Sequence, residues 1–181
     1  KHADRAGLRV LIQHKADVNA AEADGTTALH WAAYRDDADS VEVLIRAGPR
    51  VNAANHLGAT PLWNASMNAG AAIVKQLLDA GANPNLALLA GETPLMVAAR
   101  SGKPDIVLLL LAKGADANAR GSRQQTALMW AAAQRHPEVV KLLVAHGADV
   151  HARSSEWQEM MAVPPHGLPQ YNKIIPHGRD T

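Results

Sequence analysis

Nine histidines are the first feature of this sequence that could do chemistry, because imidazoles bind metal ions and transfer protons. His146 and His151 flank one predicted turn, and His166 and His177 lie near the end of the chain. None of them forms the His-Glu-x-x-His spacing of a zinc enzyme. The sequence contains no cysteine that could complete a thiolate site. We therefore predict no metal ligands among the histidines.

Patterns for catalysis are equally scarce. No serine lies in a Gly-x-Ser-x-Gly elbow, and no glycine-rich phosphate loop occurs. Asp17, Asp116 and Asp149 recur at one position of a repeat, as turn residues do. The sequence predicts no enzyme activity and no cofactor.

The overall charge excludes several classes of partner. Lys and Arg number 18 against 17 Asp and Glu, without a basic run, so we expect no binding to nucleic acid. The longest apolar run, Ile106 to Ala112, is too short to cross a bilayer, and we expect no membrane insertion. The absence of cysteine favours the cytoplasm, although the compartment stays unknown. The first residue, Lys1, falls inside a pattern, so we interpret the chain as a fragment of a longer protein.

Two motifs repeat every 33 residues in a fixed phase. The first contains Thr27, Thr60, Thr93 and Thr126, in segments such as "GTTALHWAA" and "GETPLMVAA". The second reads "KADVNA", "GPRVNA", "GANPNL", "GADANA" and "GADVHA". The period predicts an incomplete repeat at 1–20 and full repeats at 21–53, 54–86, 87–119 and 120–152. Residues 153–181 are predicted to form an enlarged loop between repeats, called a finger below, that leads into a truncated repeat.

Each repeat predicts two short helices separated by a polar turn. Threonine is a good N-cap, and Pro61 and Pro94 occupy the first helical position, where no N–H is needed. The second helix should begin near "KPDIV" or "HPEVV" and end at a glycine in a left-handed conformation. Lys15 takes the place of that glycine in the first unit.

These motifs resemble the ankyrin repeat, whose hallmarks are T-P-L-H-x-A and G-A-D-V-N. The resemblance covers Lys1 to about Arg153. It implies an all-α solenoid of antiparallel helix pairs, with β-hairpin-like fingers between repeats. It also implies that the fold binds protein partners through the finger tips and the first helix of each repeat.

Two departures from the family pattern carry expectations. Only His30 keeps the histidine of T-P-L-H; Trp63, Met96 and Met129 replace it, which predicts added apolar surface in the groove. Gln124 stands where other fingers have glycine, so we expect the fourth finger to turn differently. Trp31 and Trp130 share one repeat position, for which packing between first helices is favoured over binding.

Matching the family's contact positions residue by residue gives candidate partner-binding residues. In the repeats they are Tyr34, Arg35, His56, Leu57, Met67, Asn68, Leu89, Glu92, Arg100, Arg123, Gln125 and Gln134. The leucine-rich third finger adds Leu88, and the enlarged finger at the end of the chain adds its apolar residues Trp157 and Tyr171. The finger "NLALLAGET" carries adjacent leucines where solvated residues are usual, so Leu88 and Leu89 predict a partner-facing or self-association patch. The alternative is that Leu86 and one of the pair fold back onto a neighbouring finger.

We therefore expect a non-catalytic module that presents its surface to a protein partner of unknown identity. A structural spacer or scaffold within a larger protein is the alternative. A ligand or metal site formed by residues 153–181 is a third hypothesis.

Overall fold

The computed structural model describes residues 5–68 and 70–155, and these residues form nine α-helices. Their bounds are α1 Arg5–Gln13, α2 Ala28–Tyr34, α3 Ala38–Arg46, α4 Pro61–Asn68, α5 Ala71–Asp79, α6 Pro94–Arg100, α7 Pro104–Ala112, α8 Ala127–Ala133 and α9 Pro137–Ala145. The predicted all-α solenoid is confirmed. The predicted repeat boundaries stay predictions.

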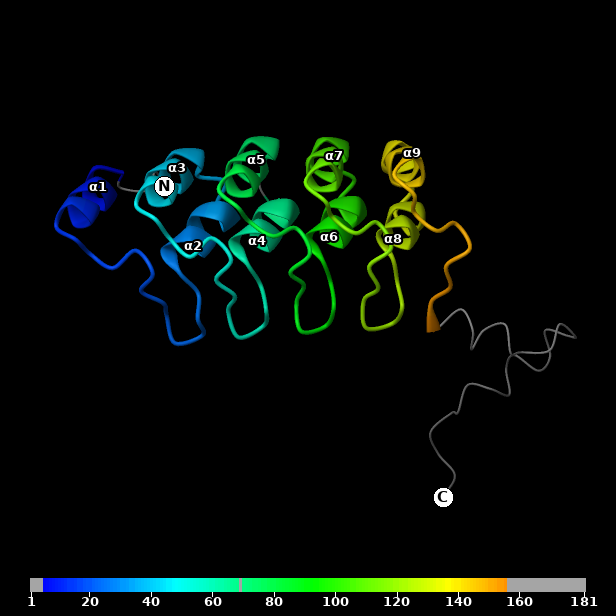
Figure 1. Cartoon of the computed structure of the whole chain (residues 1–181), viewed down its shortest axis with the longest axis horizontal. Coiled ribbons are helices and arrows are strands. Elements are labelled where there is room, and N and C mark those ends of the chain that lie inside the picture. The colour runs from blue at the N-terminus through cyan, green and yellow to red at the C-terminus, as the bar shows by residue number, and fades with distance from the viewer. Residues whose placement is uncertain (1–4, 69, 156–181) are drawn as a thin grey trace, which may run out of the picture.

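The helices form two parallel rows (Figure 1). The first helices, α2, α4, α6 and α8, pack one against the next, and the second helices α1, α3, α5, α7 and α9 do the same. Loops extend beyond the row of first helices, away from the second helices, and we call each of these loops a finger. The first helices therefore lie between the second helices and the fingers.

The helix starts follow the predicted capping chemistry. The Thr93 hydroxyl accepts a hydrogen bond from the Met96 N–H at 3.3 Å, and Thr126 accepts from Met129 at 3.4 Å. Pro104 and Pro137 open α7 and α9, as predicted. These caps satisfy N–H groups that a short helix cannot satisfy by itself.

Turns at the helix ends require left-handed residues. Lys15 has φ of 60°, which confirms that it takes the conformation of the repeat glycine. Asp36 and Arg135 also have positive φ, of 57° and 59°, in the turn between the two helices of a repeat. Their residue types did not predict this conformation, which is unfavourable for residues other than glycine.

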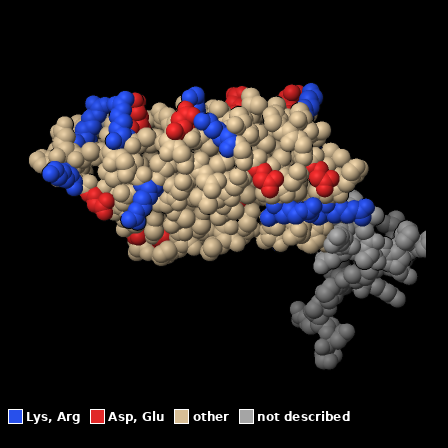
Figure 2. All heavy atoms as spheres, in the orientation of Figure 1, with Lys and Arg blue, Asp and Glu red and all other residues tan. Residues whose placement is uncertain are grey.

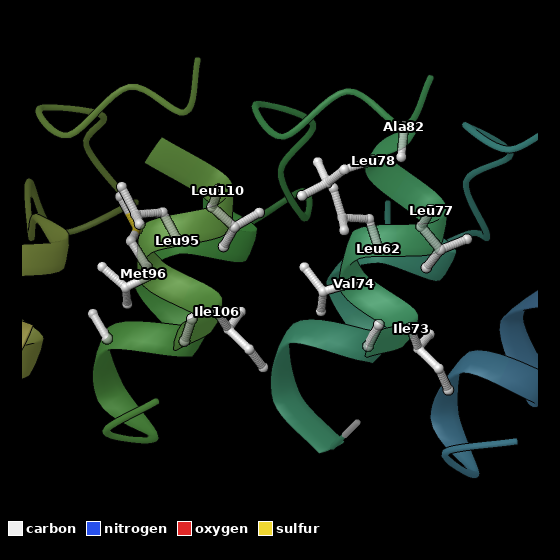
Figure 3. Close-up of a cluster of buried hydrophobic side chains, with 14 of the residues drawn as sticks. Leu62, Ile73, Val74, Leu77, Leu78, Ala82, Leu95, Met96, Ile106 and Leu110 are labelled. Atoms are coloured by element: carbon white, nitrogen blue, oxygen red, sulfur yellow. The ribbon is translucent and has the colours of Figure 1, made fainter. Parts of the chain in front are cut away.

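The core is a stack of equivalent aliphatic side chains from neighbouring repeats. Leu62 and Leu95, Ile73 and Ile106, and Leu77 and Leu110 are each 2% exposed or less. Figure 3 shows the same arrangement recurring from one repeat to the next. Because these aliphatic side chains are buried between neighbouring repeats, the repeats stabilise one another.

Asparagines join successive turns. The Asn85 side chain donates to the Gly114 carbonyl at 2.9 Å and accepts from the Asp116 N–H at 2.8 Å. Asn52 and Asn118 make the same pair of bonds one repeat earlier and one repeat later. His151 occupies the next asparagine position, so its repeat lacks the amide that makes these bonds.

The structure shows where the histidine of the T-P-L-H motif and the residues that replace it lie. His30 is buried, with Nδ1 accepting from the Thr27 N–H at 3.1 Å and Nε2 lying 2.9 Å from the Ala59 carbonyl oxygen. Met96 is only 1% exposed, so the expectation that it adds apolar surface to the groove is wrong. Trp63 and Met129 are half-buried, and the buried Trp63 Nε1 has no hydrogen-bond partner.

Each complete finger is closed by two backbone hydrogen bonds. In the third finger, the Leu88 N–H donates to Glu92 and the Gly91 N–H donates to Leu88. Among the described residues only one isolated antiparallel bridge, Ala21 with Thr27, has β character, so the fingers are hairpin-like turns without strands. Gln124 adopts φ of 59° and closes its finger by the same bonds, so the predicted difference in the fourth finger is wrong.

Candidate functional site

The first helices and the fingers together form one side of the stack, which we call the inner face. A hydrogen bond of 2.9 Å from Trp31 Nε1 in α2 to Glu22 Oε1 in the first finger connects the two parts. Side chains from the two parts therefore lie close enough to contact one ligand surface.

An aromatic cluster lies at the N-terminal end of the inner face. The rings of Trp31 and Tyr34 meet edge to face with centroids 6.1 Å apart, and the Arg35 guanidinium carbon lies 5.5 Å from the Trp31 ring centroid. Trp31 is 40% exposed and Tyr34 is 47% exposed. Exposed, mutually supported aromatic side chains with a nearby arginine are typical of protein-binding hot spots.

Beside this cluster lies an open groove of about 420 Å³. Apolar and polar side chains line it together: Leu8, Ala28, Trp31, Ala32 and Leu44, with Glu22, Arg35, Asp37 and Ser40. In the other described repeats the equivalent side of each first helix packs against a preceding first helix.

A second cluster connects the third and fourth repeats. Arg100 forms a part-buried ion pair with Glu92, and its guanidinium carbon lies 5.3 Å from the Trp130 ring centroid. His136 Nε2 lies 3.1 Å from the Arg100 carbonyl oxygen. The Arg100 side chain thus lies between the third finger and the first helix of the fourth repeat, with its charge paired to Glu92.

The finger tips carry the most exposed leucines of the described chain. Leu89 is 83% exposed and Leu57 is 68% exposed, and the Leu89 N–H donates to the Leu57 carbonyl oxygen at 2.9 Å. Leu86 and Leu88 are half-buried. Only one leucine of the predicted adjacent pair therefore lies fully on the surface, and Leu57 of the neighbouring finger joins it.

The remaining predicted residues are spread along the inner face. His56, Asn68, Arg123 and Gln134 are exposed, whereas Met67 and Gln125 are half-buried. Trp157 and Tyr171 lie outside the described residues. The structure thus distributes the candidates over the finger tips and first helices without gathering them into one pocket.

Charge on the finger tips changes from one end of the stack to the other. The first finger carries Asp24, whose pKa is lowered because it accepts hydrogen bonds from the Thr26 N–H and hydroxyl. The fourth finger carries Arg120 and Arg123, and Arg153 begins the fifth. Figure 2 shows Lys and Arg atoms gathered near the lower edge, at the end where the described chain stops.

The described part of the chain was also searched for a metal site and for a membrane-spanning helix. Residues 5–68 and 70–155 contain no group of three His, Asp or Glu side chains placed to hold a metal ion. Within the same residues, every helix is too short or too polar to span a bilayer.

Sequence reasoning missed two residues of the N-terminal cluster as candidates. Trp31 seemed to be a packing residue, because it shares a repeat position with Trp130. Val97 holds that position in the third repeat and is fully buried, whereas Trp31 is 40% exposed and donates a hydrogen bond to Glu22. Glu22 carried no signal of its own, since its role depends on the hydrogen bond from Trp31.

A comparison with protein families gives one match. The model for ankyrin repeats, built as three copies, matches residues 2–87 and again residues 62–154. No curated protein is similar enough to the chain to match it. The two family matches together cover nearly every described residue, including both clusters and the exposed finger tips.

Proposed function

Because the chain belongs to the ankyrin repeat family, we propose that it is a non-catalytic recognition module whose inner face binds a partner protein. Ankyrin repeats generally mediate protein–protein interaction. The preformed helices and fingers would lose little conformational entropy on docking, which favours affinity.

The observation that carries the proposal is that exposed large apolar side chains are adjacent on the inner face, as Leu57 and Leu89 are on two hydrogen-bonded finger tips. Tyr34, Leu57 and Leu89 are each between 47% and 83% exposed, although their own repeats bury most of the large aliphatic side chains. Exposed apolar residues beside charged ones are typical of protein interfaces. The mixture of signs along the face favours a protein surface over a polyanion.

The proposal is tested by affinity capture with the full chain followed by quantitative mass spectrometry. One variant replaces Tyr34 and Arg35 by alanine, and another replaces Leu57 and Leu89 by serine. All four side chains are exposed, so the variants should keep the fold. We expect each variant to lose at least about 90% of the specific partner, as loss of hot-spot residues does.

A matched control is available on the opposite row of helices. Leu108 of α7 is 47% exposed, the same fraction as Tyr34, but it lies on a second helix. Leu108→Ser should leave capture unchanged. Equal capture by every variant would overturn the proposal and favour a structural spacer.

A further inference from the structure

His30 is a fully buried imidazole that links the repeat of α2 and α3 to the repeat of α4 and α5. Because the Thr27 N–H can only donate, Nδ1 is the acceptor at 3.1 Å and Nε2 carries the ring proton. Nε2 then donates to the Ala59 carbonyl oxygen at 2.9 Å. Thr27 is the N-cap of α2, whereas Ala59 lies just before α4. The neutral ring, in one tautomer, therefore joins the two repeats.

A proton on Nδ1 is incompatible with these bonds. The Nδ1–H and the Thr27 N–H would then be two donors facing each other. If the Thr27 hydroxyl, 2.8 Å from Nδ1, accepted the new bond, the Thr27 N–H would still lose its acceptor. The positive charge would also be buried between the repeats, and this burial lowers the pKa of the ring. Protonation thus weakens the link that the neutral ring makes.

The charged groups around the ring do little to offset a buried charge. Helix α4 carries no ionisable side chain. On α3, Asp39, Glu42 and Arg46 are all exposed, and so are Arg35 at the end of α2 and His56 on the second finger. Asp24 of the first finger is the carboxylate that favours the protonated ring, but it is exposed and already accepts two hydrogen bonds from Thr26.

Only one of the described junctions between repeats carries such a group. Trp63, Met96 and Met129 occupy the position of His30 in the following repeats, and none of them binds a proton. His136 also links two repeats, since its Nε2 lies 3.1 Å from the Arg100 carbonyl oxygen, but a protonated ring keeps that bond. A fall in pH should therefore weaken the junction at His30 more than the others.

We propose that His30 is an acid-sensitive link, whose protonation lets α1–α3 open away from α4–α9 before the rest of the stack unfolds. The main contacts across this junction are those of α2 with α4 and of α3 with α5. Because repeats in a stack are stabilised chiefly by their neighbours, α4–α9 keep their own contacts when this junction opens. Trp31 and Tyr34 lie on α2, so opening also separates them from the rest of the inner face.

The ordinary titration of an imidazole limits the size of the effect. An exposed ring with a pKa of about 6.5 is roughly 10% protonated at pH 7.5 and about 97% protonated at pH 5. If only the opened junction binds the proton, the equilibrium constant for opening rises by at most about thirtyfold over this range. Aspartate and glutamate ordinarily titrate near pH 4, so this range reports mainly on histidines.

Native-state hydrogen exchange of the full chain between pH 7.5 and 5 tests the proposal. NMR gives the protection factor of each amide, which corrects for the intrinsic pH dependence of exchange. We expect the protection of the Ala32 amide in α2 to fall by at least about threefold, and that of Ala131, at the equivalent place in α8, by less than about threefold.

Two histidine variants show whether His30 is responsible. His30→Met introduces the residue that is buried at the equivalent position 96, and it should remove the fall in protection at Ala32. His56→Met removes an exposed histidine from the second finger and should leave that fall unchanged. A fall that persists in His30→Met overturns the inference, and so does one that is below about threefold at Ala32 or equal at Ala32 and Ala131.

The ring itself gives a second measurement that needs no variant. The ¹⁵N chemical shifts of His30 in the folded chain should show Nε2 protonated and Nδ1 unprotonated at pH 7.5. The folded ring should become charged only below the midpoint of an exposed imidazole, near pH 6.5. A ring with Nδ1 protonated at pH 7.5, or one that titrates at or above that midpoint, overturns the inference. Neither experiment uses a partner, so the proposed binding function is tested separately.

Discussion

The guanidinium carbon of Arg100 lies 5.3 Å from the ring centroid of Trp130, one repeat further along the chain. The same arginine is paired with Glu92 at the base of its own finger. A finger and two first helices thus meet at one side chain. This contact couples the third and fourth repeats on the inner face, where the partner is proposed to bind.

Replacing Arg100 by methionine, the residue at the equivalent position 67, should weaken that coupling. The variant loses a part-buried ion pair and a cation–π contact, and we expect the free energy of unfolding to fall by about 1 kcal/mol. Chemical denaturation measures the change. The tryptophan emission of the chain should shift in Arg100→Met, because Trp130 loses its cation–π partner, and stay unchanged in Arg46→Met, where an exposed arginine pairs with Glu42 on α3.

Protonation of His30 should destabilise the fold. Burial lowers the pKa of its imidazole below the ordinary value of 6.5, and Nδ1 already accepts a hydrogen bond from Thr27. The unfolded chain therefore binds the proton more readily, so stability present above pH 6.5 is lost as the pH falls below it. Between pH 7.5 and 5, His30→Met should show a smaller loss of unfolding free energy than the original chain. Equal pH dependence of the two proteins would contradict this assignment.

The asparagine bonds between turns should make a measurable contribution to stability. Asn85→Ala removes one bond to Gly114 and one from Asp116, and the backbone groups left behind are exposed. We expect a loss of about 1–2 kcal/mol in the free energy of unfolding. Asn68→Ala, at an exposed helix end, should change it by less than about 0.5 kcal/mol. Similar losses for both variants would show that the inter-turn bonds are not responsible.

Much of this fold could be predicted because the repeat makes each residue's role recur. Thr93 and Thr126 cap helices, and Lys15 takes the glycine conformation, as their repeat positions indicated. Gln124 was assigned wrongly because residue type suggested a different turn. The closing bonds of the finger instead hold Gln124 in the left-handed region that glycine prefers.

The exposure of individual site residues could not be predicted in the same way, because it depends on what lies in the neighbouring repeat. Leu88 and Leu89 are adjacent in sequence, and the backbone of both lies against Gly58 of the preceding finger, yet Leu88 is half-buried while Leu89 is 83% exposed. Trp31 is 40% exposed, whereas Val97 at the same position of the third repeat is fully buried. The sequence of a single repeat therefore does not determine the exposure of either side chain.

The two leucines of the third finger should respond differently to charge. Leu88→Asp should lower the free energy of unfolding by about 1 kcal/mol, because it places a carboxylate in a half-buried position. Leu89→Asp should leave stability unchanged and reduce partner capture. Thermal unfolding and capture of both variants measure the two effects. Loss of stability in Leu89→Asp would show that its side chain packs more closely than its exposure indicates.

The most direct test of the inner face as a recognition surface is oxidative footprinting of the chain with and without its captured partner. Tyr34, Leu57 and Leu89 are exposed on the inner face, whereas Leu108 and Val144 are similarly exposed on the second helices. The proposed function predicts that the partner protects the first three side chains and leaves the other two as reactive as before. Protection of Leu108 and Val144 with unchanged oxidation of Tyr34, Leu57 and Leu89 would contradict it.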